Sequence, residues 1–294
     1  MNKLNIYLVK LLKKLSILSF FNFVLTQRYK SVKVKILVKH GIGLTNLILK
    51  PEWLDQLIER FTTDGNKSFV DVGVNIGQTL IRLKTLYPNI QYLGFEPNAT
   101  CVSYVQELIK KNSYQRCLVL NVALASANGI LKLQKSYDVD SRASLVAELR
   151  PDYFAGFEHI MAICYSLFYM DENIEFIKID VEGAELEVLQ GMEDAVLRFQ
   201  PIITCEVLDS HNDEVKEFTQ YRSDAVCQLL TQWNYKIIRL HTTVNNLIER
   251  VESIDHIKIN QWTEVSSHCN DYLFYPKDRH DDVMEKLNSL IAVI

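Results

Sequence analysis

Apolar and polar positions alternate along this chain in a regular rhythm that begins near residue 68. Short runs rich in β-branched and aromatic residues are each followed by a stretch with apolar residues every three or four positions, the spacing of a helix. The expected strands are residues 68–72, 91–95, 117–122, 173–179, 201–208, 235–240 and 271–275. The expected helices are residues 79–86, 99–111, 184–199 and 213–233. This alternation predicts an α/β fold, in which helices cover both faces of a mostly parallel sheet.

One section, residues 123–172, breaks the rhythm. We expect a hairpin around residues 129–134 there, together with an irregular insert that carries Arg142 and Arg150. No internal repeat of the length used by solenoid proteins is visible, so the pattern favours a single sheet with a local insertion.

The first 51 residues follow a different pattern, which predicts a helical arm. Leucines lie on one face of a helix, at Leu4, Leu8, Leu11, Leu15 and Leu18. The apolar stretch that follows, residues 16–25, is too short to span a bilayer. Three interpretations remain open: a helix docked on the body, an interfacial membrane helix within residues 1–30, or a signal peptide.

Charge separates the same two parts of the chain. Residues 1–51 contain ten Lys or Arg and no Asp or Glu. Subtracting these ten from the total of 32 basic residues leaves 22 against 36 acidic residues, so the body carries a net charge of −14. An acidic body argues against nucleic-acid binding, whereas the basic arm favours its own partner, such as an anionic membrane surface.

The six cysteines have neither metal-binding nor disulfide spacing, and we interpret them as small buried residues of a protein in the reducing cytoplasm.

The loop after the first expected strand carries the first candidate binding residues. It contains Asp71, Gly73, Asn75 and Gly77. Gly73 allows a tight turn and the close approach of a ligand. Gly77 does the same at the start of a helix, where free N–H groups favour an electron-rich ligand. The spacing differs from that of pyrophosphate-binding loops, and an ordinary strand–helix turn is the alternative.

Glu96 ends the second expected strand, 25 residues after Asp71. A carboxylate at this position can accept two hydrogen bonds from the 2′,3′-diol of a ribose, and it disfavours a 2′-phosphate. The alternative is a solvated strand end. The separation of Glu96 from the glycine-rich turn along the sequence favours the ribose-binding interpretation.

Carboxylates gather after the fourth expected strand, where Asp180, Glu182 and Glu185 occur within six residues. They repel one another unless a cationic or protic group lies among them, and a sulfonium, a metal, Lys178 or Arg142 would serve. Capping of a helix N-terminus explains Glu185 easily and Asp180 poorly.

Two further candidate catalytic residues follow. Glu206 lies within the apolar fifth strand, where a carboxylate is costly unless it is paired or catalytic. His211, in the next loop, is a candidate general base, with a surface histidine as the alternative.

Two segments resemble the FkbM family of S-adenosylmethionine-dependent methyltransferases. They are residues 69–78 with 94–98, and residues 177–191, which contain Asp-Val-Glu-Gly-Ala-Glu followed by Val-Leu-Gln-Gly. The resemblance implies a Rossmann-like class I methyltransferase domain over residues 52–294, with core motifs in 68–210 and a seven-stranded sheet whose last strand is antiparallel.

The resemblance also implies roles for individual residues. Asp71, Gly73, Asn75 and Gly77 would hold the methionine and ribose parts of the cofactor, Glu96 would bind the ribose hydroxyls and Ala123 would lie near adenine. The expected reaction is methyl transfer to a hydroxyl of a sugar, a glycan or another small molecule.

For the deprotonation of that hydroxyl, the candidates are Asp180, Glu182, Glu206 and His211. A divalent metal is the less favoured way to activate the hydroxyl. Two other functions stay open: a nicotinamide-dependent dehydrogenase, and a non-enzymatic cofactor-binding scaffold anchored by the basic arm.

Overall fold

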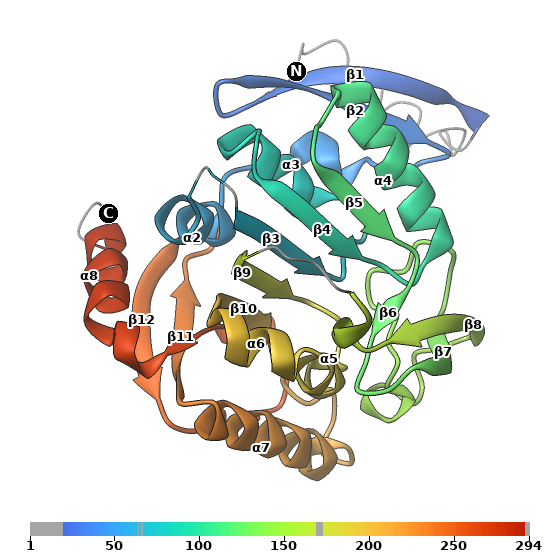
Figure 1. Cartoon of the computed structure of the whole chain (residues 1–294). Coiled ribbons are helices and arrows are strands. Elements are labelled where there is room, and N and C mark those ends of the chain that lie inside the picture. The colour runs from blue at the N-terminus through green and yellow to red at the C-terminus, as the bar shows by residue number, and fades with distance from the viewer. Residues whose placement is uncertain (1–19, 64, 66, 169–172, 292–294) are drawn as a thin grey trace.

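A mixed eight-stranded sheet forms the centre of the protein in the computed structural model, which describes residues 20–63, 65, 67–168 and 173–291 (Figure 1). In spatial order its strands are β12 (Ile248–Ile254), β11 (Tyr235–Thr242), β13 (Asp271–Pro276), β10 (Ile202–Glu206), β9 (Asn173–Ile179), β3 (Lys67–Val72), β4 (Gln91–Phe95) and β5 (Cys117–Leu120). The strands from β10 to β5 are parallel, whereas β13 is antiparallel to both of its neighbours. This confirms the α/β fold and the antiparallel strand at residues 271–275.

The expected number of strands, seven, was too small by one. The additional strand is β12, which pairs with β11 in antiparallel orientation at the edge of the sheet. Only its first residue, Ile248, is fully buried, because the strand packs at an edge. Its charged positions therefore hide it from a search for apolar runs.

Helices cover both faces of this sheet, as expected. They are α2 (Trp53–Phe61), α3 (Gln78–Leu86), α4 (Ala99–Asn112), α5 (Glu185–Gly191), α6 (Glu193–Phe199), α7 (Lys216–Gln232) and α8 (His280–Ile291). Neighbouring residues of β3 point to opposite faces, so Phe69 packs with α2, α3, α4 and α8, whereas Val70 packs with α5, α6 and α7.

The single helix expected over residues 184–199 is wrong, because two helices, α5 and α6, meet at Met192. At Gly191 a Cβ atom would lie 2.1 Å from the backbone oxygen of Ala125. The chain therefore needs glycine at this close approach, and glycine has a low helix propensity.

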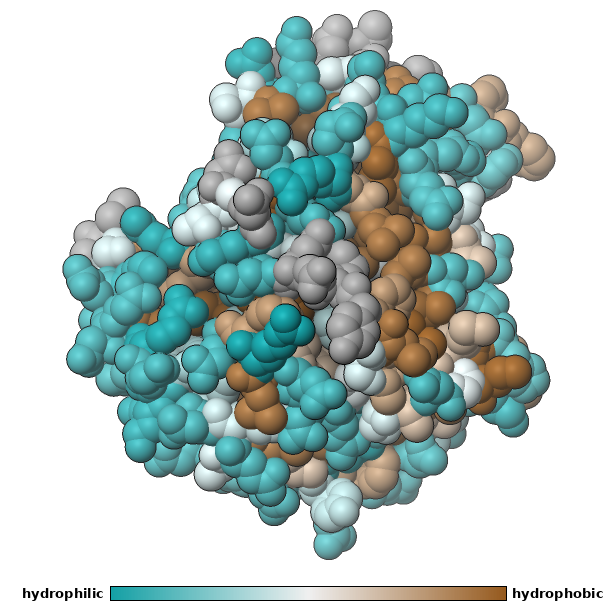
Figure 2. Space-filling model, viewed as in Figure 1, coloured by the Kyte–Doolittle hydropathy of each residue, from teal (hydrophilic) through white to brown (hydrophobic). Residues whose placement is uncertain are grey.

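A second, three-stranded sheet lies beside the β5 edge. Its order is β6 (Ala123–Leu124), β8 (Gly156–Ile163) and β7 (Gly129–Lys135). The hairpin expected at residues 129–134 is therefore a single strand, β7, which pairs with the distant β8. Cross-strand neighbours Ile130 and Met161 are both exposed, and Figure 2 shows apolar residues gathered on this side of a mainly hydrophilic face.

The N-terminal part described by the structure is a β-hairpin, which corrects the helical arm expected over residues 1–51. Its strands are β1 (Asn22–Tyr29) and β2 (Val32–Lys39). β-Branched and lysine residues alternate in β2, which is the period of a strand rather than of a helix. The leucine repeat of residues 4–18 lies outside the described residues. In the part of the chain that the structure describes, no helix has the length and apolarity needed to cross a membrane.

A buried arginine joins this hairpin to the body. Arg82 of α3 donates a hydrogen bond to the Tyr29 hydroxyl at 2.6 Å and forms ion pairs with Asp55 and, at 2.7 Å, with Glu52. Burial raises the pKa of Glu52, and the Arg82 charge opposes that rise. The hairpin is thus part of the folded body, anchored through one guanidinium that neutralises two carboxylates.

We predict that Arg82→Met lowers the free energy of unfolding by about 3–5 kcal/mol, because Asp55 then remains buried without its cation. Urea unfolding followed by circular dichroism measures the change. Arg60→Met, an exposed substitution on α2, is the control and should change stability by less than about 0.5 kcal/mol. Equal losses in the two variants would contradict the anchoring role.

Candidate active site

The loop after β3 approaches the loop after β9 more closely than any side chain would permit. Gly73 has φ of 87°, and a Cβ there would lie 1.8 Å from the backbone oxygen of Asp180. Asn75 also has a positive φ, 49°. Gly77 has φ of 79°, but a Cβ there would meet Leu108 of α4 at 3.2 Å. Gly73 therefore brings two loops together, whereas Gly77 permits the packing of two helices.

Glu96 fixes the loops that follow β3 and β4. Its two carboxylate oxygens accept hydrogen bonds from the backbone N–H groups of Asn75, at 2.7 Å, and of Asn98, at 2.9 Å. Burial raises the pKa of Glu96 to about 7, although both N–H groups act to lower it. Each oxygen keeps a further lone pair for a ligand hydroxyl.

A cavity of about 290 Å³ opens beside Glu96, close to the lower size limit of small-molecule sites. Its lining includes Gly73, Asn75, Gln78, Glu96, Leu124, Leu133, Asp140, Leu145, Asp180, Glu182 and Glu206. Leu124, and not the predicted Ala123, contributes the apolar wall from β6, because alternate residues of a strand face opposite sides. Gly77 does not line this cavity either.

Asp71 lies beneath the cavity and does not line it. Its carboxylate is fully buried and accepts a hydrogen bond from the Tyr92 hydroxyl at 2.5 Å. The Lys178 ammonium lies 3.5 Å from Asp71 and 3.1 Å from Asp180, and it donates to the Gly73 carbonyl at 2.9 Å. Asp71 therefore holds Tyr92 and Lys178 below the cavity, and its contact with the cofactor stays a prediction.

Burial shapes the ionisation of this group of side chains. Burial raises the pKa of Asp71, and the Lys178 charge opposes that rise. For Lys178, burial favours the neutral amine, but the carboxylates of Asp180 and Asp71 outweigh it and raise the pKa. Lys178 is therefore a permanent cation at the floor of the site.

Three predicted catalytic residues come together at one point. Asp180, Glu182 and Glu206 each offer a carboxylate oxygen within 4.8 Å of the other two. Arg150 donates to Glu182 at 2.7 Å, which holds that side chain at one side of the group. Asp271 lies opposite Glu206 in the pairing of β10 with β13.

The crowding of carboxylates changes their acidity. Burial and the neighbouring Asp180 raise the pKa of Glu206 well above its usual range, and Asp271 adds to the effect. The same two causes raise the pKa of Glu182 to about 7 and that of Asp271 to about 8. The group can therefore hold or accept protons near neutral pH, as a general base must.

A larger cavity of about 1040 Å³ adjoins the first. Residues 45–54 and 244–247 form much of its wall, and Asp271 also lines it. The residues that line both cavities are Gly73, Asn75, Gln78, Asp180 and Glu206. Two ligands bound in the two cavities would therefore meet beside Asp180 and Glu206.

The structure does not bring His211 to this point. His211 is exposed and lines neither of the two cavities; it borders a small separate cavity together with Arg222 and Val226. His211 therefore lies apart from the other three candidate bases, and its role as a base stays a prediction.

Sequence reasoning missed Asp271, although a signal was present. It is the first residue of a strand expected to be antiparallel, and the start of such a strand lies at the same sheet edge as the ends of its parallel neighbours.

The carboxylate group also satisfies the basic requirement of a metal site, since hard divalent cations prefer oxygen ligands. Asp180 and Glu182 each already have a cationic partner, Lys178 and Arg150 respectively. Those two cations compete with a metal for the same oxygens.

Comparison with known proteins agrees with this geometry. The Methyltransferase FkbM domain matches residues 71–237. Methyltransferase sdnD of Sordaria araneosa is 27% identical over 177 residues, 50% of this chain and 68% of that protein. Methyltransferase 1 of Beauveria bassiana is 22% identical over 185 residues, 56% of this chain and 74% of that protein.

The crystal structure of methyltransferase FkbM from Methylobacillus flagellatus aligns with a TM-score of 0.46 at 17% identity, over 72% of this chain and 44% of that chain. Because the family domain covers more than half of the sequence, this protein belongs to the FkbM methyltransferase family.

Proposed function

We propose that this protein transfers a methyl group from S-adenosylmethionine to a hydroxyl of a sugar, a glycan or another small molecule. The observation that carries the proposal is that a small and a large cavity share a border at Asp180 and Glu206. A two-substrate transfer needs this arrangement, because alignment of the two reactants supplies much of the rate.

The smaller cavity suits the methyl donor. Glu96 would bind the ribose hydroxyls, Leu124 and Leu133 would pack against the adenine, and the loop at Gly73 and Asn75 would hold the methionine end. When bound, the donor supplies an electrophilic methyl group on a positively charged sulfur. Asp180 and Glu182 place carboxylates along the same cavity, which attract that cation.

The larger cavity suits the acceptor, and Glu206 is the favoured base. Its raised pKa makes it a stronger proton acceptor than an ordinary carboxylate, and it lines both cavities. The hydroxyl oxygen would form its bond to the methyl carbon as the bond from carbon to sulfur breaks, and the hydroxyl proton would pass to Glu206. Asp180 would keep that proton on Glu206 by its nearby charge.

The charge at the border between the two cavities restricts the chemical class of the acceptor. Acidic side chains at the border between the cavities disfavour a phosphate group at the reacting end, and together with the net charge of −14 on residues 52–294 they argue against a nucleic acid. They favour a neutral or cationic acceptor group, such as the hydroxyl of a carbohydrate.

We predict that Glu96→Gln weakens S-adenosylmethionine binding by about 10- to 100-fold, because an amide cannot accept both backbone hydrogen bonds and the ribose hydroxyls. Isothermal titration calorimetry with the donor, its demethylated product and NAD measures the change. Binding by wild-type protein should also weaken as the pH falls through about 7, where Glu96 gains a proton. Glu107→Gln, on α4 outside the cavity, is the control. Preferential binding of NAD would favour the dehydrogenase alternative.

We predict that Glu206→Gln lowers kcat by about 10²- to 10⁴-fold and leaves donor affinity nearly unchanged, because only proton transfer is lost. Screening radiolabelled methyl transfer to nucleotide sugars, free glycans and lipid-linked glycans identifies the acceptor for this assay. The wild-type rate should rise with pH as Glu206 loses its proton, and the variant should lose this dependence. Glu249→Gln, an exposed change on β12, is the control.

Three outcomes would decide between the alternatives for this site. Unchanged turnover in Asp180→Asn would exclude a central role for Asp180. If EDTA abolished the activity and Mg²⁺ restored it, a metal ion rather than Glu206 would activate the acceptor hydroxyl. Donor binding without transfer to any acceptor would favour the scaffold alternative.

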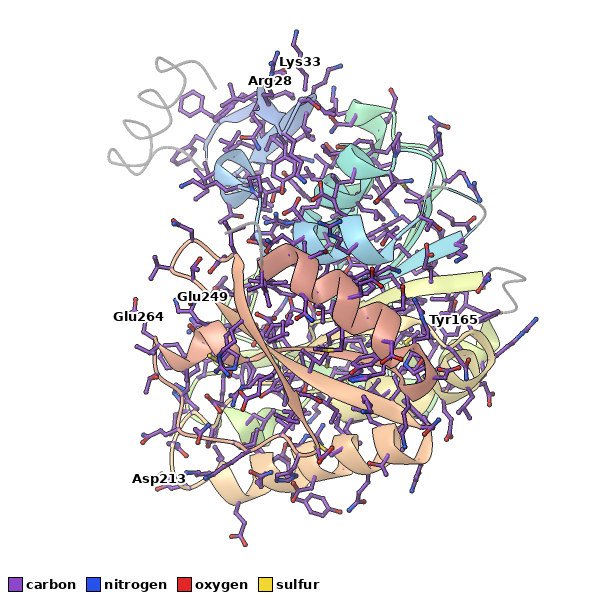
Figure 3. The ribbon with its side chains drawn as sticks, turned by 90° about the vertical axis from the view of Figure 1, so that its left-hand side faces the viewer. Arg28, Lys33, Tyr165, Asp213, Glu249 and Glu264 are labelled. Atoms are coloured by element: carbon purple, nitrogen blue, oxygen red, sulfur yellow. The ribbon has the colours of Figure 1, made fainter. Side chains whose placement is uncertain are left out.

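We also propose that the N-terminal hairpin contacts an anionic membrane surface, with the catalytic body in the cytoplasm. Arg28 on β1 lies directly opposite Lys33 on β2, and both side chains are exposed (Figure 3). Like charges in a directly opposed pair destabilise a sheet, so an anionic partner would relieve the repulsion. Each such residue near anionic lipid contributes about 1 kcal/mol.

We predict that, at about 0.1 M salt, the protein floats with vesicles containing about 30% phosphatidylserine, because each basic residue near anionic lipid contributes about 1 kcal/mol of binding free energy. It should not float with pure phosphatidylcholine vesicles, which carry no net charge. Arg28→Glu with Lys33→Glu should abolish flotation. Arg198→Glu with Lys258→Glu changes the same total charge at exposed sites elsewhere and should preserve it. Equal flotation of the two double variants would contradict the hairpin surface.

A further inference from the structure

A cysteine, a histidine and a glutamate form a relay outside the two cavities of the active site. The Cys269 Sγ lies 3.2 Å from His241 Nδ1, and His241 Nε2 lies 2.8 Å from a carboxylate oxygen of Glu252. Cys269 ends η5 (Ser266–Cys269), whereas His241 and Glu252 come from the paired strands β11 and β12. A nucleophile, a base and a third group that orients the base are the arrangement that activates a thiol.

The pairing of the two strands explains why these groups meet. His241 lies opposite Arg250, and Arg239 lies opposite Glu252, so all four side chains belong to one face of the β11–β12 ribbon. The backbone carbonyl of Cys269 accepts a hydrogen bond from Arg239 Nε at 2.7 Å, which holds η5 over this face.

A cationic side chain lies against the histidine of this relay. Arg250 Nη2 lies 2.9 Å from His241 Nε2 and 3.2 Å from Nδ1, so the guanidinium lies against the imidazole ring. The hydrogen bond from His241 lowers the pKa of Glu252, which therefore stays ionised and continues to orient the ring. His268, adjacent to Cys269 in η5, is held by Thr242. Cationic groups near a half-exposed cysteine are typical of reactive thiols.

The other cysteines provide an internal comparison. Cys101, Cys205 and Cys227 are buried, but Cys117, Cys164 and Cys269 are half-buried, so the expectation that all six are buried is wrong for half of them.

The three half-buried thiols differ in their partners. The Cys117 thiol donates to the backbone carbonyl of Gln115 at 3.3 Å, and the Cys164 thiol donates to that of Ser126 at 3.0 Å. Burial raises the pKa of the Cys117 thiol, and the Lys84 charge opposes that rise. A carbonyl cannot take a proton from a thiol, whereas the His241 imidazole beside Cys269 can.

We propose that Cys269 is a modification site that reacts with small-molecule disulfides, with His241 as the base and Glu252 as a positioning residue. His241 Nδ1 accepts the thiol proton, and the Cys269 sulfur attacks one sulfur of the disulfide. A bond forms between these two sulfurs while the disulfide bond of the reagent breaks. The departing thiolate takes the proton from the imidazolium, so the mixed disulfide and one free thiol are the products.

The access route is exposed, and the reagent must be small. Residues 261–265, which lead into η5, are exposed, and Trp262 retains 48% of its surface. Figure 3 shows Glu249 of β12 and Glu264 of this segment on the same side of the molecule, away from the basic hairpin. Cys269 itself is half-buried, so a reagent of the size of an aromatic or peptide disulfide fits better than a folded protein.

The test measures the reaction of each cysteine in the full-length protein with 5,5′-dithiobis(2-nitrobenzoate). Samples are quenched with N-ethylmaleimide at intervals, and each cysteine is followed by peptide mass spectrometry. We predict that Cys269 reacts about ten times faster than Cys164 or Cys117, because only its thiol has a base as partner. This comparison uses the wild-type protein alone. Equal rates for Cys269 and Cys164 would overturn the proposal.

Variants then assign the roles. His241→Gln should lower the Cys269 rate about tenfold and change the dependence of that rate on pH, because the imidazole no longer takes the thiol proton, while the Cys164 rate stays constant. Glu252→Gln should lower the rate less, and Glu252→Asp should restore part of it. A constant Cys164 rate and an unchanged circular dichroism spectrum exclude general unfolding. An unchanged Cys269 profile in His241→Gln would overturn the role of the histidine.

Discussion

The active site depends on one buried ammonium group, that of Lys178. Burying a charge costs several kcal/mol unless it is paired and hydrogen-bonded, and Lys178 satisfies this condition only by contacting three groups at the ends of two strands. Asp71 lies directly opposite it in the pairing of β3 with β9, Asp180 follows it by two residues, and the Gly73 carbonyl accepts its third contact. The cost of leaving the charge unpaired thus forces the ends of both strands into one arrangement. Glycine at position 73 is what permits the chain to come this close.

Two carboxylates near this ammonium, those of Asp180 and Glu206, have different electrostatic surroundings. Asp180 shares the Lys178 charge and remains partly exposed, whereas Glu206 has burial and acidic neighbours without a cation of its own among the described residues. The same strand edge therefore holds one carboxylate that is paired with an ammonium and another whose pKa is raised. A carboxylate with a raised pKa is the group that can take a proton in an acid–base step. The close fit of the two loops at Gly73 and the proton affinity of Glu206 are therefore two consequences of one distribution of charge.

The sequence predicted the parts of this site that depend on strand periodicity. The parallel strands, the loop containing Gly73, and Glu96 and Glu206 at strand ends all follow from apolar runs that stop at a polar residue. It could not predict which side chain of a pair faces the cavity. Asp71 lies below the cavity because its partners are Lys178 and Tyr92, and neither contact is visible as a pattern along the chain. His211 lies apart because the loop after β10 turns away, a result of tertiary packing. The helical arm was expected from the leucine spacing of residues 4–18, and that spacing carries no information on the strands β1 and β2 further along the chain.

The two cavities relate differently to the family that this chain belongs to. Every residue that lines the smaller cavity lies within residues 71–237, the part matched by the family domain. The wall of the larger cavity comes in good part from residues 45–54, residues 244–247 and Asp271, all outside that match. The first of these segments connects the N-terminal hairpin to α2, whose Asp55 and preceding Glu52 bind Arg82. The family match therefore covers the whole of the smaller cavity, whereas much of the larger cavity comes from segments outside that match. In the proposed reaction the hairpin and its arginine anchor would shape the acceptor site as well as stabilise the fold, since Glu52 and Arg82 both line the larger cavity.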